Sequence, residues 1–222
     1  MRPAVDLNTL WQWDTAAEVL PELLTVFVKV TLLVTVVGTI VAALLGLLLA
    51  VLAQILPVWL SKPLRWAMDV IRMTPLIIQL IFASFVVPTS WPLLWVGTVV
   101  IGVHYSTYMA ESYIAGIMSV DRGQWEASRA LSLPQGRTWR DVVLPQALRA
   151  TLPSLGNWTI SMFKDTPFLF AIFVVEMVTK AQQYGANTFR YTEAFTIAGL
   201  IFLTASLVTA VAVRKLEKAL VY

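Results

Sequence analysis

Long stretches without a charged residue constrain this chain more than any other feature. Residues 30–60 carry no charge, and residues 73–110 carry none either. A helix of about 20 mostly apolar residues crosses a bilayer, so each stretch is longer than one crossing requires. Only 13% of the 222 residues are charged, about half the share in an average soluble domain. We therefore expect an all-α integral membrane protein.

The hydropathy pattern and the prolines fit five membrane-spanning helices in one domain, residues 1–222. Pro88 and Pro92 divide the second uncharged stretch, because proline lacks an amide donor. Pro167 is expected to break the fourth span. We expect spans at 23–52, 67–87, 93–118, 152–178 and 194–213, with a polar loop at 119–150.

The distribution of positive charge predicts the orientation of these spans. Eleven Lys and Arg residues lie in the loops after the first and third spans and in the C-terminal tail, whereas three lie in the alternate segments. Cytoplasmic segments of membrane proteins are enriched in Lys and Arg. We therefore expect the N-terminus outside, and the C-terminus and the polar loop in the cytoplasm.

Residues 126–145 form a charged, polar island between two apolar runs. The island is typical of two short helices around a turn, because Pro134 and Gly136 interrupt the first helix. The second helix, 137–143, is expected to stop near Pro145. A helical hairpin exposed between membrane spans is typical of a docking surface for a partner in the aqueous phase.

The spacing within this island resembles the EAA loop of permease subunits from ATP-binding-cassette (ABC) importers. That signature is Glu-Ala-Ala, a Gly four residues after the second Ala, and Ile-x-Leu-Pro after nine more. The corresponding residues here are Glu126, Ala127, Ser128, Ser132, Val142, Leu144 and Pro145. Ser132 stands where the signature has a Gly. Glycine allows turns that other residues resist. We expect Gly136 to supply the bend instead.

The resemblance implies that this loop contacts ATPase subunits. Glu126 is expected to anchor it, with Arg129 or Arg140 holding the hairpin together. The alternative is a solvated acid at a helix start, favoured by the helix dipole. Ala127 and Ser128 are small enough for close approach. Three leucines are expected in the hairpin core rather than at the contact, namely Leu131, Leu133 and Leu144.

Further blocks resemble permeases of the polar amino-acid (histidine/glutamine/arginine) importer family. They are Arg72-Met73-Thr74-Pro75-Leu76 with Gln79-Leu80, Ala110-Glu111 followed by Gly116-Ile117, Gly123-Gln124-Trp125-Glu126-Ala127, Leu144-Pro145-Gln146-Ala147 and Lys164-Asp165-Thr166. The chain departs from the family pattern at Met73, Ile114, Ala115 and Pro167. These departures suggest a divergent branch, for which a compatible solute such as ectoine is an alternative to an amino acid.

The resemblance implies a type I ABC importer permease fold in the bacterial cytoplasmic (inner) membrane. It implies an ABC ATPase dimer, a second permease subunit (identical or paralogous) and a periplasmic or tethered solute-binding protein as partners. The chain has no Gly-x-x-x-x-Gly-Lys-Ser/Thr phosphate loop, so ATP and Mg are expected on the ATPase chains and no cofactor on this one. We expect no nucleic-acid partner.

Polar residues within the expected spans are candidates for the solute pathway, because such residues usually face a bundle interior or an aqueous cavity. His104, Tyr108 and Glu111 share one helix face at i, i+4 and i+7. The alternatives are hydrogen bonds between helices and, for Lys164 and Asp165, a buried pair with Glu176 or Arg72. The full set of pathway candidates is Gln79, His104, Tyr108, Glu111, Asn157, Lys164 and Asp165.

These patterns favour the membrane-spanning subunit of an importer for a small polar solute over three other classes. A secondary carrier or channel is the first alternative, although we find no inverted repeat. A membrane-embedded enzyme would need a metal or nucleophile cluster, and the chain has one His and no Cys. A purely structural membrane subunit would tolerate substitution of Glu126 and Lys164. We expect a transport subunit without catalytic or metal-binding residues.

Overall fold

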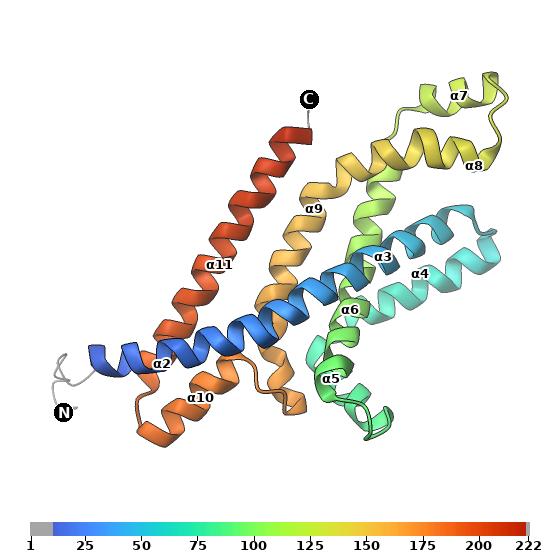
Figure 1. Cartoon of the computed structure of the whole chain (residues 1–222). Helices are drawn as coiled ribbons and strands as arrows, with labels where there is room; N and C mark the ends of the chain where they lie inside the picture. The colour runs from blue at the N-terminus through green and yellow to red at the C-terminus, as the bar shows by residue number, and fades with distance from the viewer. Residues whose placement is uncertain (1–10, 221–222) are drawn as a thin grey trace, which may run out of the picture.

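The computed structural model describes residues 11–220, and every regular element in that range is helical (Figure 1). The elements are α2 (Trp13–Val26), η1 (Phe27–Leu32), α3 (Leu33–Ile55), α4 (Val58–Met73), α5 (Leu76–Val86), α6 (Leu93–Met118), α7 (Arg122–Ala130), α8 (Gln135–Arg137), η2 (Thr138–Val143), α9 (Leu144–Asp165), η3 (Thr166–Ile172), α10 (Met177–Thr188) and α11 (Tyr191–Leu220).

The first helix is much longer than the expected span at 23–52. Elements α2, η1 and α3 form one continuous helix of 43 residues from Trp13 to Ile55, with a π-helical segment in its middle. At 1.5 Å per residue it is roughly 65 Å long, about twice the thickness of a hydrocarbon core. It therefore has to cross a membrane obliquely or extend beyond it, and Figure 1 shows it running obliquely past α6, α9 and α11.

Two of the expected spans are bent. The expected span at 67–87 falls on helices α4 and α5. The chain bends by 104° between these two helices. Thr74 there is extended (φ −93°, ψ 137°), as the residue before Pro75 prefers. The chain that contains residues 152–178 bends by 54° between Ile172 and Met177. By length and composition, the described residues hold three helices able to cross a membrane, or up to five if each bent pair is one span.

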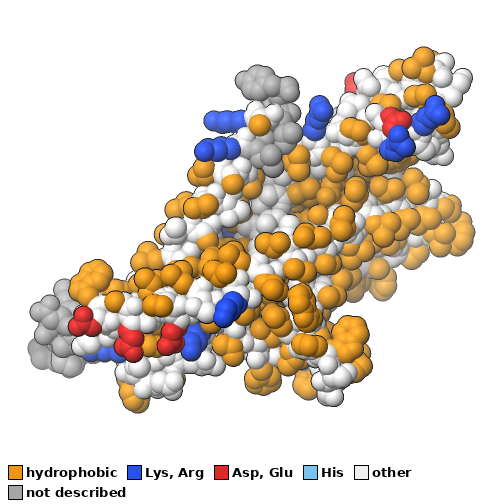
Figure 2. Space-filling view, in the orientation of Figure 1, with side chains coloured by type: hydrophobic (Ala, Val, Ile, Leu, Met, Phe, Trp, Pro, Cys, Tyr) orange, Lys and Arg blue, Asp and Glu red, His pale blue; other side chains and the backbone are white. Residues whose placement is uncertain are grey.

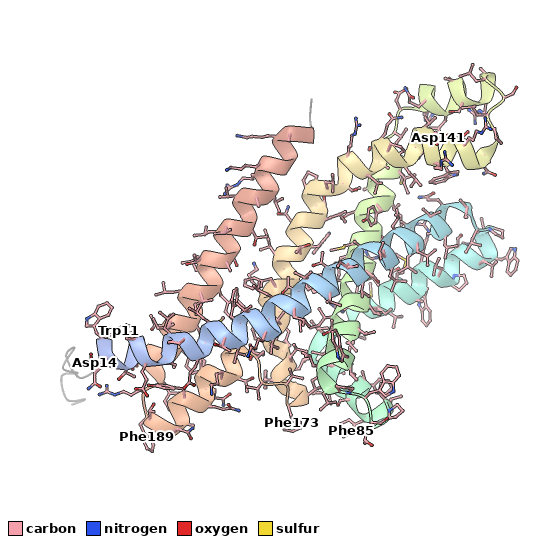
Figure 3. The ribbon with its side chains drawn as sticks, viewed as in Figure 1. Trp11, Asp14, Phe85, Asp141, Phe173 and Phe189 are labelled. Carbon is pink, nitrogen blue, oxygen red and sulfur yellow. The ribbon has the colours of Figure 1, made fainter. Side chains whose placement is uncertain are left out.

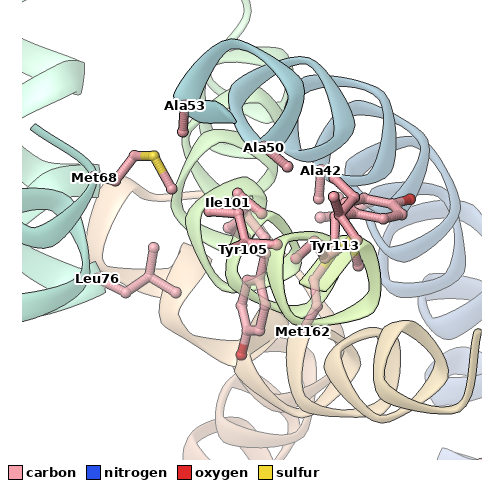
Figure 4. Close-up of a cluster of buried hydrophobic side chains, with 14 of the residues drawn as sticks. Ala42, Ala50, Ala53, Met68, Leu76, Ile101, Tyr105, Tyr113 and Met162 are labelled. Carbon is pink, nitrogen blue, oxygen red and sulfur yellow. The ribbon is translucent and has the colours of Figure 1, made fainter. Parts of the chain in front are cut away.

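The centre of the bundle is the contact between α3 and α6 (Figure 4). Every fourth residue on one face of α3 is small and buried: Gly38, Ala42, Gly46 and Ala50. A Cβ on Gly46 would lie 2.8 Å from the carbonyl oxygen of Ser106. Such close backbone approach is how membrane helices gain packing contacts, because lipid and side chains are equally apolar.

The two ends of the bundle differ in what they present. Figure 1 shows the hairpin of α7 and α8 at the same end as the C-terminal end of α11, and α2 and α10 at the other. Hydrophobic side chains cover the middle of the face in Figure 2, and charged side chains gather mainly at its ends. Figure 3 places Asp141 at the hairpin end and Phe85, Phe173 and Phe189 at the opposite end.

Candidate functional site

The first arm of the hairpin is α7, which carries most of the expected coupling residues. Asp121 caps it, with its carboxylate accepting a 2.7 Å hydrogen bond from the amide of Gly123. Glu126, Ala127 and Arg129 are exposed on this helix. A capped helix thus presents these three residues on the surface of the chain.

The turn after α7 is made by Ser132, not by Gly136. Ser132 has φ 52°, whereas no glycine in the described chain has a positive φ. The amide of Ser132 donates to the carbonyl of Arg129 at 2.9 Å, and that of Leu133 donates to Ser128 at 3.0 Å. This pair of bonds is the Schellman ending of a helix, whose left-handed residue is usually Gly. The family's Gly position therefore keeps its turn here with a serine.

The second arm does not stop at Pro145. Helices α8, η2 and α9 run on without a break from Gln135 to Asp165. The π-helical turn η2 lies just before the proline. A proline ring clashes with the carbonyl four residues earlier in a regular α-helix. The wider turn accommodates it, so the hairpin and the fourth expected span share one helix.

The two arms are joined by aromatic packing rather than by an arginine. The rings of Trp125 and Trp139 meet edge to face, with centroids 5.5 Å apart. Ser128 is 3% exposed, and its hydroxyl donates to the carbonyl of Gln124. Arg140 pairs with its neighbour Asp141 at 2.8 Å and is otherwise exposed.

The outer surface of the hairpin is open. Within the described chain, Glu126 makes no ion pair or side-chain hydrogen bond, so neither Arg129 nor Arg140 holds it. Leu131 is 73% exposed and is not in the hairpin core, contrary to expectation, because it caps α7 at its outer end. Leu133 and Leu144 are half-buried. The hairpin therefore offers an exposed carboxylate and an exposed leucine that no residue in the described part of the chain covers.

The second candidate site is a polar network between α4, α5, α6 and the C-terminal end of α9. The Nδ1 of His104 lies 3.1 Å from Oε1 of Gln79, and the Gln79 amide donates to the carbonyl of Ile71 at 2.7 Å. The hydroxyl of Tyr105 donates to Asp165 at 2.7 Å. Asp165 thus bonds to a tyrosine and not to Glu176 or Arg72.

A charged cluster extends this network towards the hairpin end. Arg72 forms ion pairs with Asp69 and, at 3.4 Å, with Glu111. The hydroxyl of Tyr108 lies 3.3 Å from the carbonyl of Arg72, and the Tyr108 ring packs 4.8 Å from that of Trp158. The cluster joins α4, α6 and α9 around their polar side chains.

This cluster borders an open cavity of about 570 Å³ that is lined by both polar and apolar groups. The cavity is lined by Arg72, Tyr108, Glu111, Ser112, Ala115, Gly116, Ser119, Ala150, Ser154 and Trp158. A small zwitterion carries one carboxylate and one ammonium group, which a guanidinium and a carboxylate can bind. The cavity thus combines suitable size with both charges.

The structure brings some of the expected pathway residues together and separates others. Gln79, His104, Tyr108, Glu111 and Asp165 belong to the network described above. Two others lie outside it: Lys164 is exposed, and Asn157 lines a different cleft between α9 and α11.

Sequence reasoning did not select Arg72, Ser112 or Trp158 as pathway residues. The Trp158 indole donates to Ser112 at 2.9 Å, which fixes α9 against α6. No sequence signal marked that contact, because the two residues are 46 positions apart.

Residues 42–222 match the family described as the binding-protein-dependent transport system inner membrane component. The chain belongs to this family. The relatives in this permease family include the probable amino-acid ABC transporter permease y4tG of Sinorhizobium fredii, 39% identical over 70% of this chain and 69% of that protein. The glutamine transport system permease GlnP of Escherichia coli is 34% identical over 68% of this chain and 71% of its own. The arginine transport system permease ArtQ of Bacillus subtilis is 32% identical over 72% and 76%.

Solved structures agree with this membership. The crystal structure of an amino acid ABC transporter with histidines superposes with a TM-score of 0.85 at 27% identity, covering 94% of this chain and 99% of that chain. The inward-facing MetNI methionine ABC transporter gives 0.77 at 23% identity, over 89% and 96%, and supports the fold alone. The chain is thus an inner membrane component of a binding-protein-dependent transport system, with the fold of ABC transporter permeases.

Proposed function

We propose that this permease carries an α-amino acid through the cavity beside Arg72 and couples to an ABC ATPase dimer through the α7–α8 hairpin. The observation that carries the coupling role is the open surface of the hairpin. A capped helix, a Schellman turn and a tryptophan pair hold Glu126 and Leu131 outward, and no described residue of this chain covers them.

The proposed orientation follows from the placement of this hairpin. The hairpin and the C-terminal end of α11 lie at one end of the bundle, and that end carries the basic residues that cytoplasmic segments favour. The N-terminal end then faces the outside, where a solute-binding protein would deliver its load. A second permease, identical or paralogous, would complete the pathway, with ATP and Mg bound by the ATPase chains.

The proposed solute follows from the charges around the cavity. The Arg72 guanidinium suits an α-carboxylate and the Glu111 carboxylate suits an α-ammonium group. Several relatives are named for amino acids. Ectoine, whose amidine ring also carries both charges, is the alternative that the assay has to separate.

The test is ATP-driven uptake by the complete complex in proteoliposomes, assembled with its ATPase and binding protein. A panel of amino acids and ectoine would be compared for wild type, Glu126→Ala and the control Asp14→Ala, an exposed acid on α2. We expect one class of solute to be carried, and Glu126→Ala to weaken ATPase binding roughly tenfold or more, as the loss of an interface hot spot does.

Three results would contradict the proposal. Equal ATPase binding and uptake by Glu126→Ala and wild type would remove the docking role. Uptake that persists without the ATPase chains would indicate a secondary carrier. Solute affinity unchanged in Arg72→Ala would place the solute elsewhere in the protein.

A further inference from the structure

A cleft separates α9 from α11 at the hairpin end of the bundle. It has a volume of about 290 Å³ and is lined by Pro153, Asn157, Ala210, Val213, Arg214 and Glu217. The two helices touch beside it, since a Cβ on Gly156 would lie 2.6 Å from the side chain of Val213. The cleft is therefore a groove between two helices that pack against each other beside it.

The rim of this cleft is basic. Arg149 lies one helical turn before Pro153 on α9, and Lys218 lies one turn after Arg214 on α11. All three basic side chains are exposed, and none of them forms an ion pair with another described residue. Glu217 offsets part of this charge, but the rim stays positive. Its chemistry favours an anion.

The surface leading away from the rim is apolar. Leu203, Leu207 and Val211 are spaced at four residues along α11 and are each about half exposed. Only 6% of the most apolar window of α11 is buried within the chain. An apolar stripe that ends at Arg214 has the charge pattern of a phospholipid, whose acyl chain is apolar and whose headgroup can be anionic.

We propose that the α9–α11 cleft binds an anionic phospholipid, with its phosphate at Arg149 and Arg214 and an acyl chain along the stripe. Basic pockets between membrane helices on the cytoplasmic side are suited to such headgroups. A second copy of the chain is an outcome that the test separates, since a twofold contact with this rim on its axis would bring the basic side chains of both copies together. The proposal rests on the proposed orientation of the chain in one respect: that orientation places the lipid in the cytoplasmic leaflet.

The test is native mass spectrometry of the purified full-length chain with equimolar phosphatidylglycerol and phosphatidylcholine. The variant Arg149→Gln/Arg214→Gln would be compared with Lys62→Gln/Arg122→Gln, which removes two exposed charges outside the cleft. We expect selective phosphatidylglycerol binding, weakened roughly 30-fold in the cleft variant, the effect of two charges at a membrane surface. The control pair should bind as wild type.

Each other outcome overturns the proposal. Equal weakening by both double variants would show only a general attraction of basic residues for anionic lipid. Equal binding of phosphatidylcholine would remove the anion site. Competition by glycerol 1-phosphate at the affinity of the lipid would indicate a site for free phosphate esters. Loss of lipid binding on dimerisation would identify a second copy as the occupant. None of these measurements needs the ATPase, so the result is separate from that of the uptake assay.

Discussion

Replacing Ser132 by glycine should stiffen the hairpin that we propose docks on the ATPase. Ser132 has φ 52° at the end of α7, and the left-handed conformation costs a residue with a Cβ roughly 1–2 kcal/mol. Glycine avoids this cost but loses more chain entropy on folding, about 0.5–1 kcal/mol. The net gain should therefore be somewhat under about 1 kcal/mol for the closed turn.

Hydrogen exchange measures this gain directly at the amides that close the turn. The amides of Ser132 and Leu133 donate to Arg129 and Ser128, and they exchange only when the turn opens. A gain of about 1 kcal/mol slows exchange roughly fivefold after correction for intrinsic rates. The matched control is Ser132→Ala, which removes the hydroxyl but keeps the Cβ.

Two results would refute this reasoning. If glycine does not slow exchange relative to alanine at position 132, the backbone conformation is not strained. If alanine slows exchange as much as glycine, the serine hydroxyl rather than its φ angle weakens the turn. Exchange in α11 should not change in either variant, because it lies outside the hairpin.

Three other substitutions test the packing and the polar contacts. Gly46→Ala should overpack the α3–α6 contact, which costs about 1–3 kcal/mol of stability and lowers the midpoint of thermal unfolding. The control Gly199→Ala has no atom within 4 Å of the added Cβ and should not lower the midpoint. Equal effects of the two variants would contradict the packing argument. Glu176→Ala should remove the acceptor for the first amides of α10, cost about 1 kcal/mol and speed their exchange; unchanged exchange would show that the cap is dispensable. Tyr105→Phe should remove the hydrogen bond to Asp165 and lower the free energy of unfolding by about 1.5–3 kcal/mol in denaturant titration, and an unchanged titration would argue against this contact.

Local signals in the sequence accounted for the class of protein and much of the hairpin. The motif from Glu126 to Pro145 marked the segment that the structure exposes, and the family match confirmed the permease subunit. The expected end of the second arm near Pro145 is wrong, because the helix continues to Asp165. A proline signals only a missing donor and a clash, and the π-helical turn before it relieves the clash, so that the helix continues.

The sequence by itself determined that this chain is a helical membrane permease, because hydropathy, proline positions and motif spacing act over a few neighbouring residues. It also contained the small-residue stripe Gly38, Ala42, Gly46 and Ala50, which only the contact with α6 made interpretable. Tertiary structure alone decided that Asp165 meets Tyr105, 60 positions away. Such contacts depend on the 54° and 104° bends and on how helices cross, and a one-dimensional pattern does not encode which polar groups then face one another.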